Sequence, residues 1–123
     1  MDEQVDALLA QVRLHGRRDT LAGQLSYAEQ RALELGITLA GSPQVLLLDE
    51  PTAGMNQSES QQVVELIREI SQDKTVLVVE HDMGVVFGLA DRIAVLVQGQ
   101  LLAVDTPQAI AANVLVQQAY LGQ

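Results

Sequence analysis

Three polar residues follow two apolar runs in the middle of the chain. Asp49 and Glu50 close the run VLLLDE, and His81 follows the run TVLVVE. Both runs are short, aliphatic and bounded by turn formers, which predicts two buried strands. If the strands are parallel, their carboxyl ends lie at one edge of the sheet, where open α/β sheets bind ligands. There, one carboxylate can hold Mg²⁺, a second can orient or deprotonate an attacking water, and an imidazole can hydrogen-bond a terminal phosphate.

Simpler structural roles account for the same three residues. An acidic turn after a strand would explain Asp49 and Glu50, and a lone histidine after a strand is more often a solvated or capping residue. The occurrence of His81 at this distance from LLLDE favours the functional interpretation, because both segments end at the same edge of the predicted sheet.

The stretch LSYAE, which begins at Leu25, precedes a predicted helix. Ser26 and Glu29 have the spacing of a capping box. The Ser26 hydroxyl and the N–H groups of the first turn lie at the positive end of the helix dipole, where anions bind. An ordinary N-cap explains the same two residues completely and is favoured on physical grounds alone.

These segments lie within an alternating order of helices and strands. That order predicts an α/β layered domain with a mostly parallel sheet and flanking helices, and the first 24 residues predict an N-terminal helical segment. An i, i+3, i+4, i+7 apolar pattern predicts that the first helix ends near Gly16. The other predicted elements are helices at 26–41, 58–72 and 82–90, strands at 45–49 and 75–80, a hairpin at 93–104 around a QG turn, and terminal helices from 107 to about 120.

The composition narrows the classes of function. Of the 123 residues, 48% are hydrophobic and only 2% are aromatic, which predicts an aliphatic core. The net charge of -9 and the single lysine, Lys74, argue against binding nucleic acid through phosphate neutralisation. The absence of cysteine excludes disulfides and thiolate metal sites. No apolar run reaches the ~18 residues of a membrane span, and the acidic N-terminus is unlike a signal peptide.

Together, the motifs resemble the ATP-binding subunits of ABC transporters over nearly the whole chain. LSYAE is similar to the family's signature motif, usually LSGGQ, and VLLLDE to its Walker B strand with the catalytic glutamate. AGMN is similar to the D-loop, and His81 to the switch histidine. Any one motif is a weak signal, but four in the family's order are a strong one. Within the family, the subunits of importers of branched-chain amino acids are the most similar in four stretches of sequence: LSYAEQRALE, DEPTAGMN, EHDM and the final AYLG.

The resemblance implies a role for each matching residue. Asp49 would assist Mg²⁺ binding, Glu50 would polarise the hydrolytic water, and His81 would contact the γ-phosphate. The signature would face ATP held by the opposite subunit, with Ser26 and the Ala28 backbone reaching its γ-phosphate. The signature residues are Ser26, Tyr27, Ala28 and Glu29, and the D-loop residues that would touch the opposite subunit are Ala53, Gly54, Met55 and Asn56.

Two departures from the family pattern matter most, and a third, the bulky Tyr27 at the first signature glycine, is accepted in the subfamily that the chain resembles. Ala28 replaces the second glycine of the signature, and its methyl group could crowd a phosphate, since glycine is the residue that lets a backbone approach closely. Asn56 ends the D-loop, where many relatives carry aspartate.

No phosphate-binding loop accompanies these motifs. A P-loop needs G-x-x-x-x-G-K-[ST], and the only lysine lies in SQDKTV with no glycine before it. The resemblance therefore implies the C-terminal half of a subunit, with a partial P-loop NTPase-type fold. Residues 1–42 would be a remnant of the helical signature subdomain and residues 43–123 the C-terminal part of the ATPase core. The family binds ATP and Mg²⁺ and hydrolyses ATP, but we expect this chain alone to bind them weakly or not at all and to be inactive.

The family also implies partners. They are a second ATP-binding subunit and membrane permease subunits, which would place the parent subunit in the cytoplasm at the inner face of the membrane. In the family, the strand leading to the P-loop lies between segments 75–80 and 93–97, so two aliphatic edges would be unpaired here. We expect the chain to close this gap internally, to pair with a second copy or to be unstable alone, and we favour a homodimer or strand swap.

Two other functions compete with a piece of an importer ATPase. A non-catalytic interaction protein from a truncated gene could dock on an intact ATP-binding subunit through its signature helix and D-loop. An unrelated Mg²⁺-dependent hydrolase could use Asp49, Glu50 and His81, but that function leaves the stretches LSYAE and AGMN unexplained.

Overall fold

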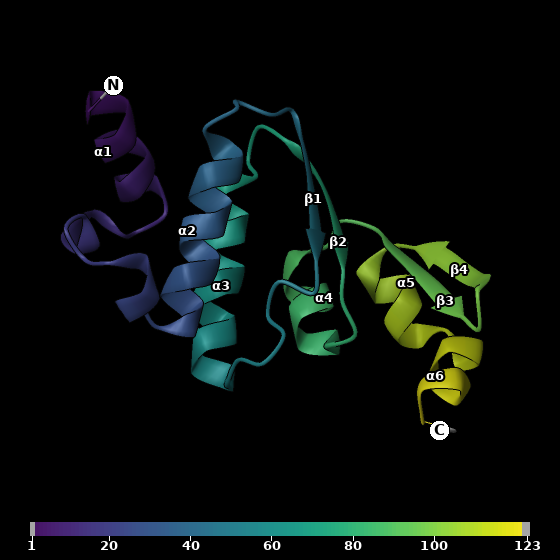
Figure 1. The fold of residues 1–123 in the computed structure, drawn as a ribbon. Coiled ribbons are helices and arrows are strands. Elements are labelled where there is room, and N and C mark those ends of the chain that lie inside the picture. The colour runs from purple at the N-terminus through teal and green to yellow at the C-terminus, as the bar shows by residue number, and fades with distance from the viewer. Residues whose placement is uncertain (1, 122–123) are drawn as a thin grey trace. The chain divides into compact units, whose positions relative to one another are not determined.

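A computed structural model describes residues 2–121 (Figure 1). Internal contacts divide the chain after Val85 into two compact units, which are described separately. The first unit contains α1 (Asp2–Gln11), the short 3₁₀ turns η1 (His15–Arg17) and η2 (Ala22–Gln24), α2 (Tyr27–Leu39), β1 (Val45–Asp49), α3 (Gln57–Ile70) and β2 (Thr75–Val79). After α4 (Met83–Leu89), which crosses the boundary, come β3 (Ile93–Val97), β4 (Gln100–Asp105), α5 (Pro107–Ala112) and α6 (Val114–Leu121).

The first helix is shorter than predicted. α1 ends at Gln11 rather than near Gly16, because Arg13 adopts a left-handed backbone with a φ of 64° and the chain turns into η1. Val12, just beyond the helix, is buried. A Cβ on Gly36 would lie 3.3 Å from a methyl group of Val12, so this glycine allows α2 to pack closely against the turn.

Caps and apolar stripes explain the two long helices. Ser26 caps α2 and Asn56 caps α3, and each side chain accepts a hydrogen bond from the backbone N–H three residues later. The apolar residues recur at helical spacing, so each helix buries one face. The predicted helices at 26–41 and 58–72 are therefore confirmed, with ends that differ by at most two residues. Their buried apolar side chains are Ala32, Leu35 and Leu39 in α2 and Val63, Leu66, Ile67 and Ile70 in α3.

The strands of the first unit are buried on one face only. β1 and β2 pair in parallel, and α2 and α3 lie on one side of the pair (Figure 1). Leu46 is buried, whereas alternate side chains of both strands are exposed. The prediction of two buried strands is thus wrong for one face of the β1–β2 sheet, because α2 and α3 pack against the opposite face and leave this one exposed. The exposed apolar side chains, called the open sheet face below, are Val45, Leu47, Leu77 and Val79.

The second unit is built on a β-hairpin. β3 and β4 are antiparallel, and Gln98 and Gly99 between them have left-handed φ values of 50° and 78°, which confirms the predicted turn. Thr106 caps α5, with Pro107 in its first turn as predicted. The buried core of this unit consists of Ile93, Ile110 and Val116.

These elements confirm the predicted α/β class with a parallel strand pair and flanking helices. Each strand pair forms a separate two-stranded sheet within the described part of the chain. The predicted division between residues 42 and 43 stays a prediction. None of the helices in residues 2–121 combines the length and the apolar character that crossing a bilayer requires.

Two neighbouring leucines test the one-sided burial of β1. We expect Leu46→Ala to lower the free energy of unfolding by about 2–5 kcal/mol, because truncating a buried leucine leaves a cavity. The matched control, Leu47→Ala, should change it by about 0.5 kcal/mol or less, because this side chain is 72% exposed. Urea titrations followed by circular dichroism at low protein concentration measure both values. Equal losses would contradict one-sided burial.

Candidate functional site

The carboxyl ends of β1 and β2 meet at one edge of their sheet. Asp49 lies opposite Val79 in the register, and the N–H of Glu50 donates a hydrogen bond to the Val79 carbonyl at 2.7 Å. Beyond the strands, Glu50 Oε1 lies 2.9 Å from His81 Nδ1. The structure therefore brings together the two residues predicted for catalysis, and their catalytic roles stay predictions.

The Glu50–His81 pair is accessible and rests on an unusual backbone. Solvent reaches 79% of the His81 side chain and 47% of the Glu50 side chain, so a ligand can approach both. Glu50 has a left-handed φ of 46°, which residues other than glycine seldom adopt. Such conformations persist only where the surrounding structure holds them, and they are frequent at functional sites.

Asp49, the predicted Mg²⁺ ligand, is exposed at the same edge. Within residues 2–121, no group of three or more His, Cys, Asp or Glu side chains comes together in a way that could hold a metal ion. Proteins commonly bind Mg²⁺ through one or two carboxylates together with substrate phosphates and waters. Asp49 therefore fits an ion that is shared with a nucleotide better than one held by side chains alone.

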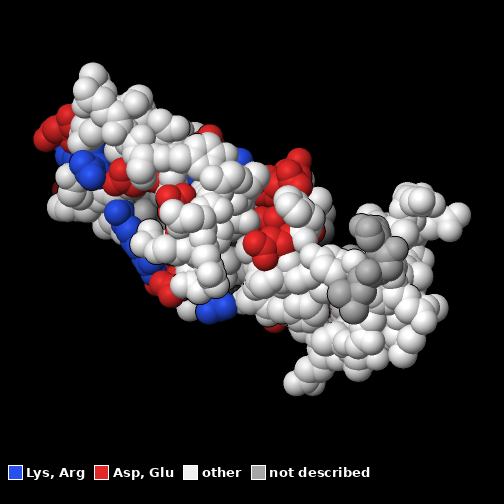
Figure 2. Space-filling view, turned by 90° about the horizontal axis from the view of Figure 1, so that it is seen from below, with Lys and Arg blue, Asp and Glu red and all other residues white. Residues whose placement is uncertain are grey.

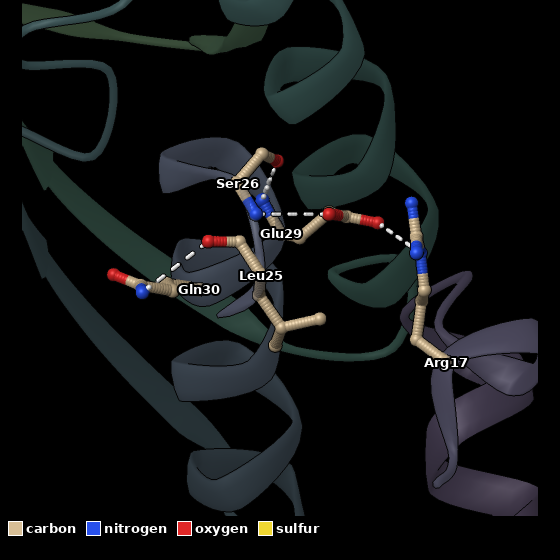
Figure 3. Close-up of polar contacts among 5 residues, drawn as sticks. All are labelled: Arg17, Leu25, Ser26, Glu29 and Gln30. Atoms are coloured by element: carbon tan, nitrogen blue, oxygen red, sulfur yellow. Dashed lines mark hydrogen bonds and ion pairs between the residues drawn. The ribbon is translucent and has the colours of Figure 1, made fainter. Parts of the chain in front are cut away.

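Ser26 and Glu29 form the complete capping box that their spacing predicts (Figure 3). The Glu29 N–H donates to Ser26 Oγ at 3.2 Å, and the Ser26 N–H donates to Glu29 Oε1 at 2.9 Å. From η1, Arg17 donates through Nε to Glu29 Oε2 at 3.0 Å. The first-turn N–H groups of Tyr27 and Ala28 have no partner within the helix, so they are the donors that an anion would meet.

The Glu29 carboxylate places negative charge at the positive end of α2. The pKa of Glu29 lies below its ordinary value of 4.5, first because the Ser26 backbone N–H donates to the ionised form. The Ser26 hydroxyl and the Arg17 guanidinium lower this pKa further, whereas burial works in the opposite direction. An ionised Glu29 would repel a phosphate at this helix end, and Arg17 offsets part of that charge.

Tyr27 connects the signature segment with the predicted D-loop of the same chain. The Arg31 guanidinium lies over its ring, 5.5 Å from the centroid. A Cβ on Gly54 would lie 3.7 Å from the Cε1 atom of the ring, so the ring lies beside this glycine. Gly54 has a φ of 77°, which glycine adopts without strain. The aromatic side chain that replaces the first signature glycine thus packs against the D-loop.

The other D-loop residues have structural roles within the chain. The N–H groups of Ala53 and Met55 each donate to the carbonyl three residues earlier, at 3.1 Å. Asn56 Oδ1 accepts a hydrogen bond from the Glu59 N–H at 2.8 Å and caps α3. Gly54 and Asn56 are exposed. The predicted contact of these residues with a second subunit stays a prediction.

Basic side chains of the first unit lie among acidic ones. Arg13 Nη1 lies 3.7 Å from a Glu65 carboxylate oxygen, and Arg31 Nη1 lies 3.2 Å from Glu34 Oε2. On the face drawn in Figure 2, blue atoms likewise adjoin red ones instead of forming a continuous basic patch. Exposed ion pairs of this kind contribute little to stability.

A pocket of about 520 Å³ lies near the D-loop in the first unit. It is lined by Met55, Asp82, Gly84, Val85 and the α3 residues Gln57, Ser60, Gln61, Val64, Glu65 and Arg68. Neither Glu50 nor His81 lines it, so this pocket does not enclose the predicted catalytic pair.

Sequence reasoning missed Thr52 and Glu80, which join the two segments of this edge. Thr52 is only 6% exposed, and its hydroxyl donates to Glu80 Oε2 at 2.7 Å. By strand alternation, Glu80 follows Val76 and Val78 on the half-buried face. A carboxylate on a half-buried face needs hydrogen-bond partners. The position of Glu80 in the alternating pattern of the strand is therefore the signal that could have indicated a bonded carboxylate here.

The capping box makes stability depend on pH. Because the pKa of Glu29 is lowered, its ionised form stabilises the fold above pH 4.5, and this contribution is lost as the pH falls through the lowered pKa. We expect Glu29→Gln to lower the melting temperature at neutral pH, and this difference should shrink below pH 4.5. The control is Asp73→Asn, at an exposed turn residue. A difference between wild type and Glu29→Gln that is independent of pH would refute the role of this charge.

Known proteins are similar to this chain in sequence and in fold. A sequence profile described as ABC transporter matches residues 1–53. The chain is 44% identical over 104 residues to the high-affinity branched-chain amino acid transport ATP-binding protein LivG of Escherichia coli (strain K12), covering 83% of this chain and 41% of LivG. It is 40% identical over 117 residues to BraF of Pseudomonas aeruginosa, which has the same description, covering 94% of this chain and 46% of BraF.

A solved structure agrees with these matches. An ATP-binding cassette of an ABC transporter, in its ADP conformation, matches with a TM-score of 0.87 and 25% identity, over 98% of this chain and 50% of that chain. The match confirms the predicted P-loop NTPase-type fold. The chain spans 41% of the length of LivG and 46% of the length of BraF. In sequence and in fold, the chain is therefore similar to a part of the ATP-binding domain of ABC transporters.

Proposed function

We propose that the chain contributes to ATP hydrolysis in the ATP-binding subunit of an ABC importer for branched-chain amino acids. The observation that carries this proposal is the 2.9 Å contact between Glu50 Oε1 and His81 Nδ1 at the carboxyl edge of β1 and β2. The similarity to LivG and BraF supports the class of solute. The parent subunit would work in the cytoplasm, at the inner face of the membrane.

Each group at this edge has one task. Glu50 engages the imidazole through Oε1, so Oε2 is the oxygen that would orient the attacking water and accept its proton. His81 would hydrogen-bond the terminal phosphate, and Asp49 would contribute an oxygen ligand to Mg²⁺. The bound ion would supply charge neutralisation for the phosphates.

The start of α2 would act on ATP held by a second ATP-binding subunit. The capping box holds the Ser26 hydroxyl at the helix end, and the N–H groups of Tyr27 and Ala28 point out of the first turn. Arg17 keeps the Glu29 charge paired beside them. The exposed D-loop would contact the second subunit, and permease subunits would complete the transporter.

A chimera gives the decisive test of Glu50. The chain alone should neither bind Mg-ATP with submillimolar affinity in calorimetry nor hydrolyse it. Joined behind the P-loop half of E. coli LivG, it should hydrolyse Mg-ATP, and Glu50→Gln should lower kcat by about 10²–10⁴-fold, because the general base is lost. Glu69→Gln, on the exposed surface of α3, is the matched control.

Three outcomes would contradict the proposal. One is a folded chimera that binds ATP but does not turn it over. Another is turnover that Glu50→Gln leaves intact. The third is turnover by the chain alone, which would mean that it assembles a phosphate site of its own.

The open sheet face favours a second candidate function. Leu47 and Leu77, which pair across the strands, are both exposed on this face. An apolar surface of this kind, beside strand edges that pair with no further strand in residues 2–121, suits contact with another polypeptide. A non-catalytic module that docks on an intact ATP-binding subunit would use this face in addition to its signature helix and D-loop. Such a module would bind the subunit in calorimetry but add no turnover to a signature-defective variant of it.

The same face leads us to propose self-association of the isolated chain. Light scattering over a wide range of protein concentration should show a homodimer, because pairing two copies would bury the apolar side chains. Leu47→Lys and Leu77→Lys should each shift the equilibrium towards monomer, since the added charge would be desolvated in the dimer. Ser42→Lys, at an exposed residue outside the strands, is the control. A monodisperse wild-type monomer at every concentration would refute self-association.

A further inference from the structure

The Glu80 carboxylate joins the two segments that carry the Glu50–His81 pair. Its Oε2 atom accepts two hydrogen bonds from Thr52, at 2.7 Å from the hydroxyl and 3.2 Å from the backbone N–H. Its Oε1 atom accepts the His81 N–H at 3.3 Å. One half-buried carboxylate thus receives donors from the segment after β1 and from the segment after β2.

The joined residues are immediate neighbours of the pair. Thr52 lies two positions after Glu50, and His81 directly follows Glu80. The Glu50 N–H is itself held by the Val79 carbonyl at 2.7 Å. Contacts on both sides of Glu50 therefore restrain its left-handed backbone, and the Glu80 contacts also fix the start of the His81 segment.

The Glu50–His81 contact needs such support because it is exposed. Side chains in an accessible contact lose entropy when they are held in one geometry, and water competes for their hydrogen bond. The Thr52–Glu80 contacts are sheltered instead, and a carboxylate that accepts a hydroxyl at 2.7 Å forms a strong, charge-assisted hydrogen bond. The sheltered contacts can therefore set the positions that the exposed pair adopts.

We propose that Glu80 and Thr52 are positioning residues for the Glu50–His81 pair. They touch no substrate, and they act by holding the two segments at the separation that the pair requires. This inference rests on the proposed function for its relevance to ATP hydrolysis, but the positioning itself is a property of the nucleotide-free chain. A purely structural role would stabilise the fold without affecting the geometry of the pair.

The experiment is nuclear magnetic resonance on the isotopically labelled 123-residue chain without nucleotide. It follows the ring nitrogens of His81 and the carboxyl carbon of Glu50, well below the melting temperature of each variant. Thr52→Val removes only the hydroxyl donor, Glu80→Gln removes the charge, and Thr52→Ser keeps the hydroxyl. Glu50→Ala gives the His81 signals without the contact. Thr38→Val is the matched control, because the Thr38 hydroxyl donates to the Glu34 carbonyl on an exposed helix face.

We expect Thr52→Val and Glu80→Gln to move the His81 ring signals towards those of Glu50→Ala. Both substitutions should also shift the Glu50 carboxyl signal, whereas Thr52→Ser and Thr38→Val should match the wild type. Unmoved His81 and Glu50 signals in Thr52→Val, even with a lower melting temperature, would overturn the inference. If Glu80→Gln does not fold, Thr52→Val and Thr52→Ser decide the question alone. Because no nucleotide is used, failure of the ATP hydrolysis proposal leaves this result unaffected.

Discussion

The parallel pairing of β1 with β2 is the constraint on which the geometry of the first unit depends. Its register, from Val45 opposite Thr75 to Asp49 opposite Val79, ends the two strands at one level. The hydrogen bond from the Glu50 N–H to the Val79 carbonyl continues the pairing beyond the strands. A slip of one residue would turn the side chains to the opposite faces. Leu46 would leave the core, and Glu50 would move away from its position beside the imidazole.

The helices hold this pairing in place through the sheltered side of the sheet. α2 and α3 bury apolar side chains on the side where Leu46 is buried, so the strand ends are anchored from one side. The candidate site residues Asp49, Glu50 and His81 lie where the two strands end, at the carboxyl edge of the sheet, and solvent reaches them there. This division between a packed scaffold and accessible loops is common in proteins that bind ligands. It also explains why Thr52, though part of a loop segment, is buried and bonded to Glu80.

Local patterns in the sequence were enough to predict most elements and the position of the two candidate catalytic groups at one edge of the sheet, but not the contact between them. Ser26 with Glu29, Thr106 with Pro107, and the QG turn carry their own structural signals, because caps and turns depend on neighbouring residues. The end of α1 was misplaced because Arg13 adopts a left-handed backbone that its residue type does not indicate. The prediction of buried strands is wrong for the open sheet face, because an all-aliphatic strand has the same sequence pattern whether helices cover one of its faces or both. Glu80 was missed because its partner Thr52 is distant in sequence.

The left-handed backbone of Glu50 has a consequence for how this position can vary. Asparagine, aspartate and glycine enter that region more readily than β-branched residues do. Under the proposed function, substitutions at residue 50 would be filtered twice, once by the need for a carboxylate and once by the backbone. Aspartate satisfies both filters but has a shorter reach towards His81, whereas valine satisfies neither. In a mutational scan of this residue, most replacements would both strain the left-handed backbone and remove the carboxylate. Asparagine and glycine remove the carboxylate but adopt this backbone readily, so they separate the two effects.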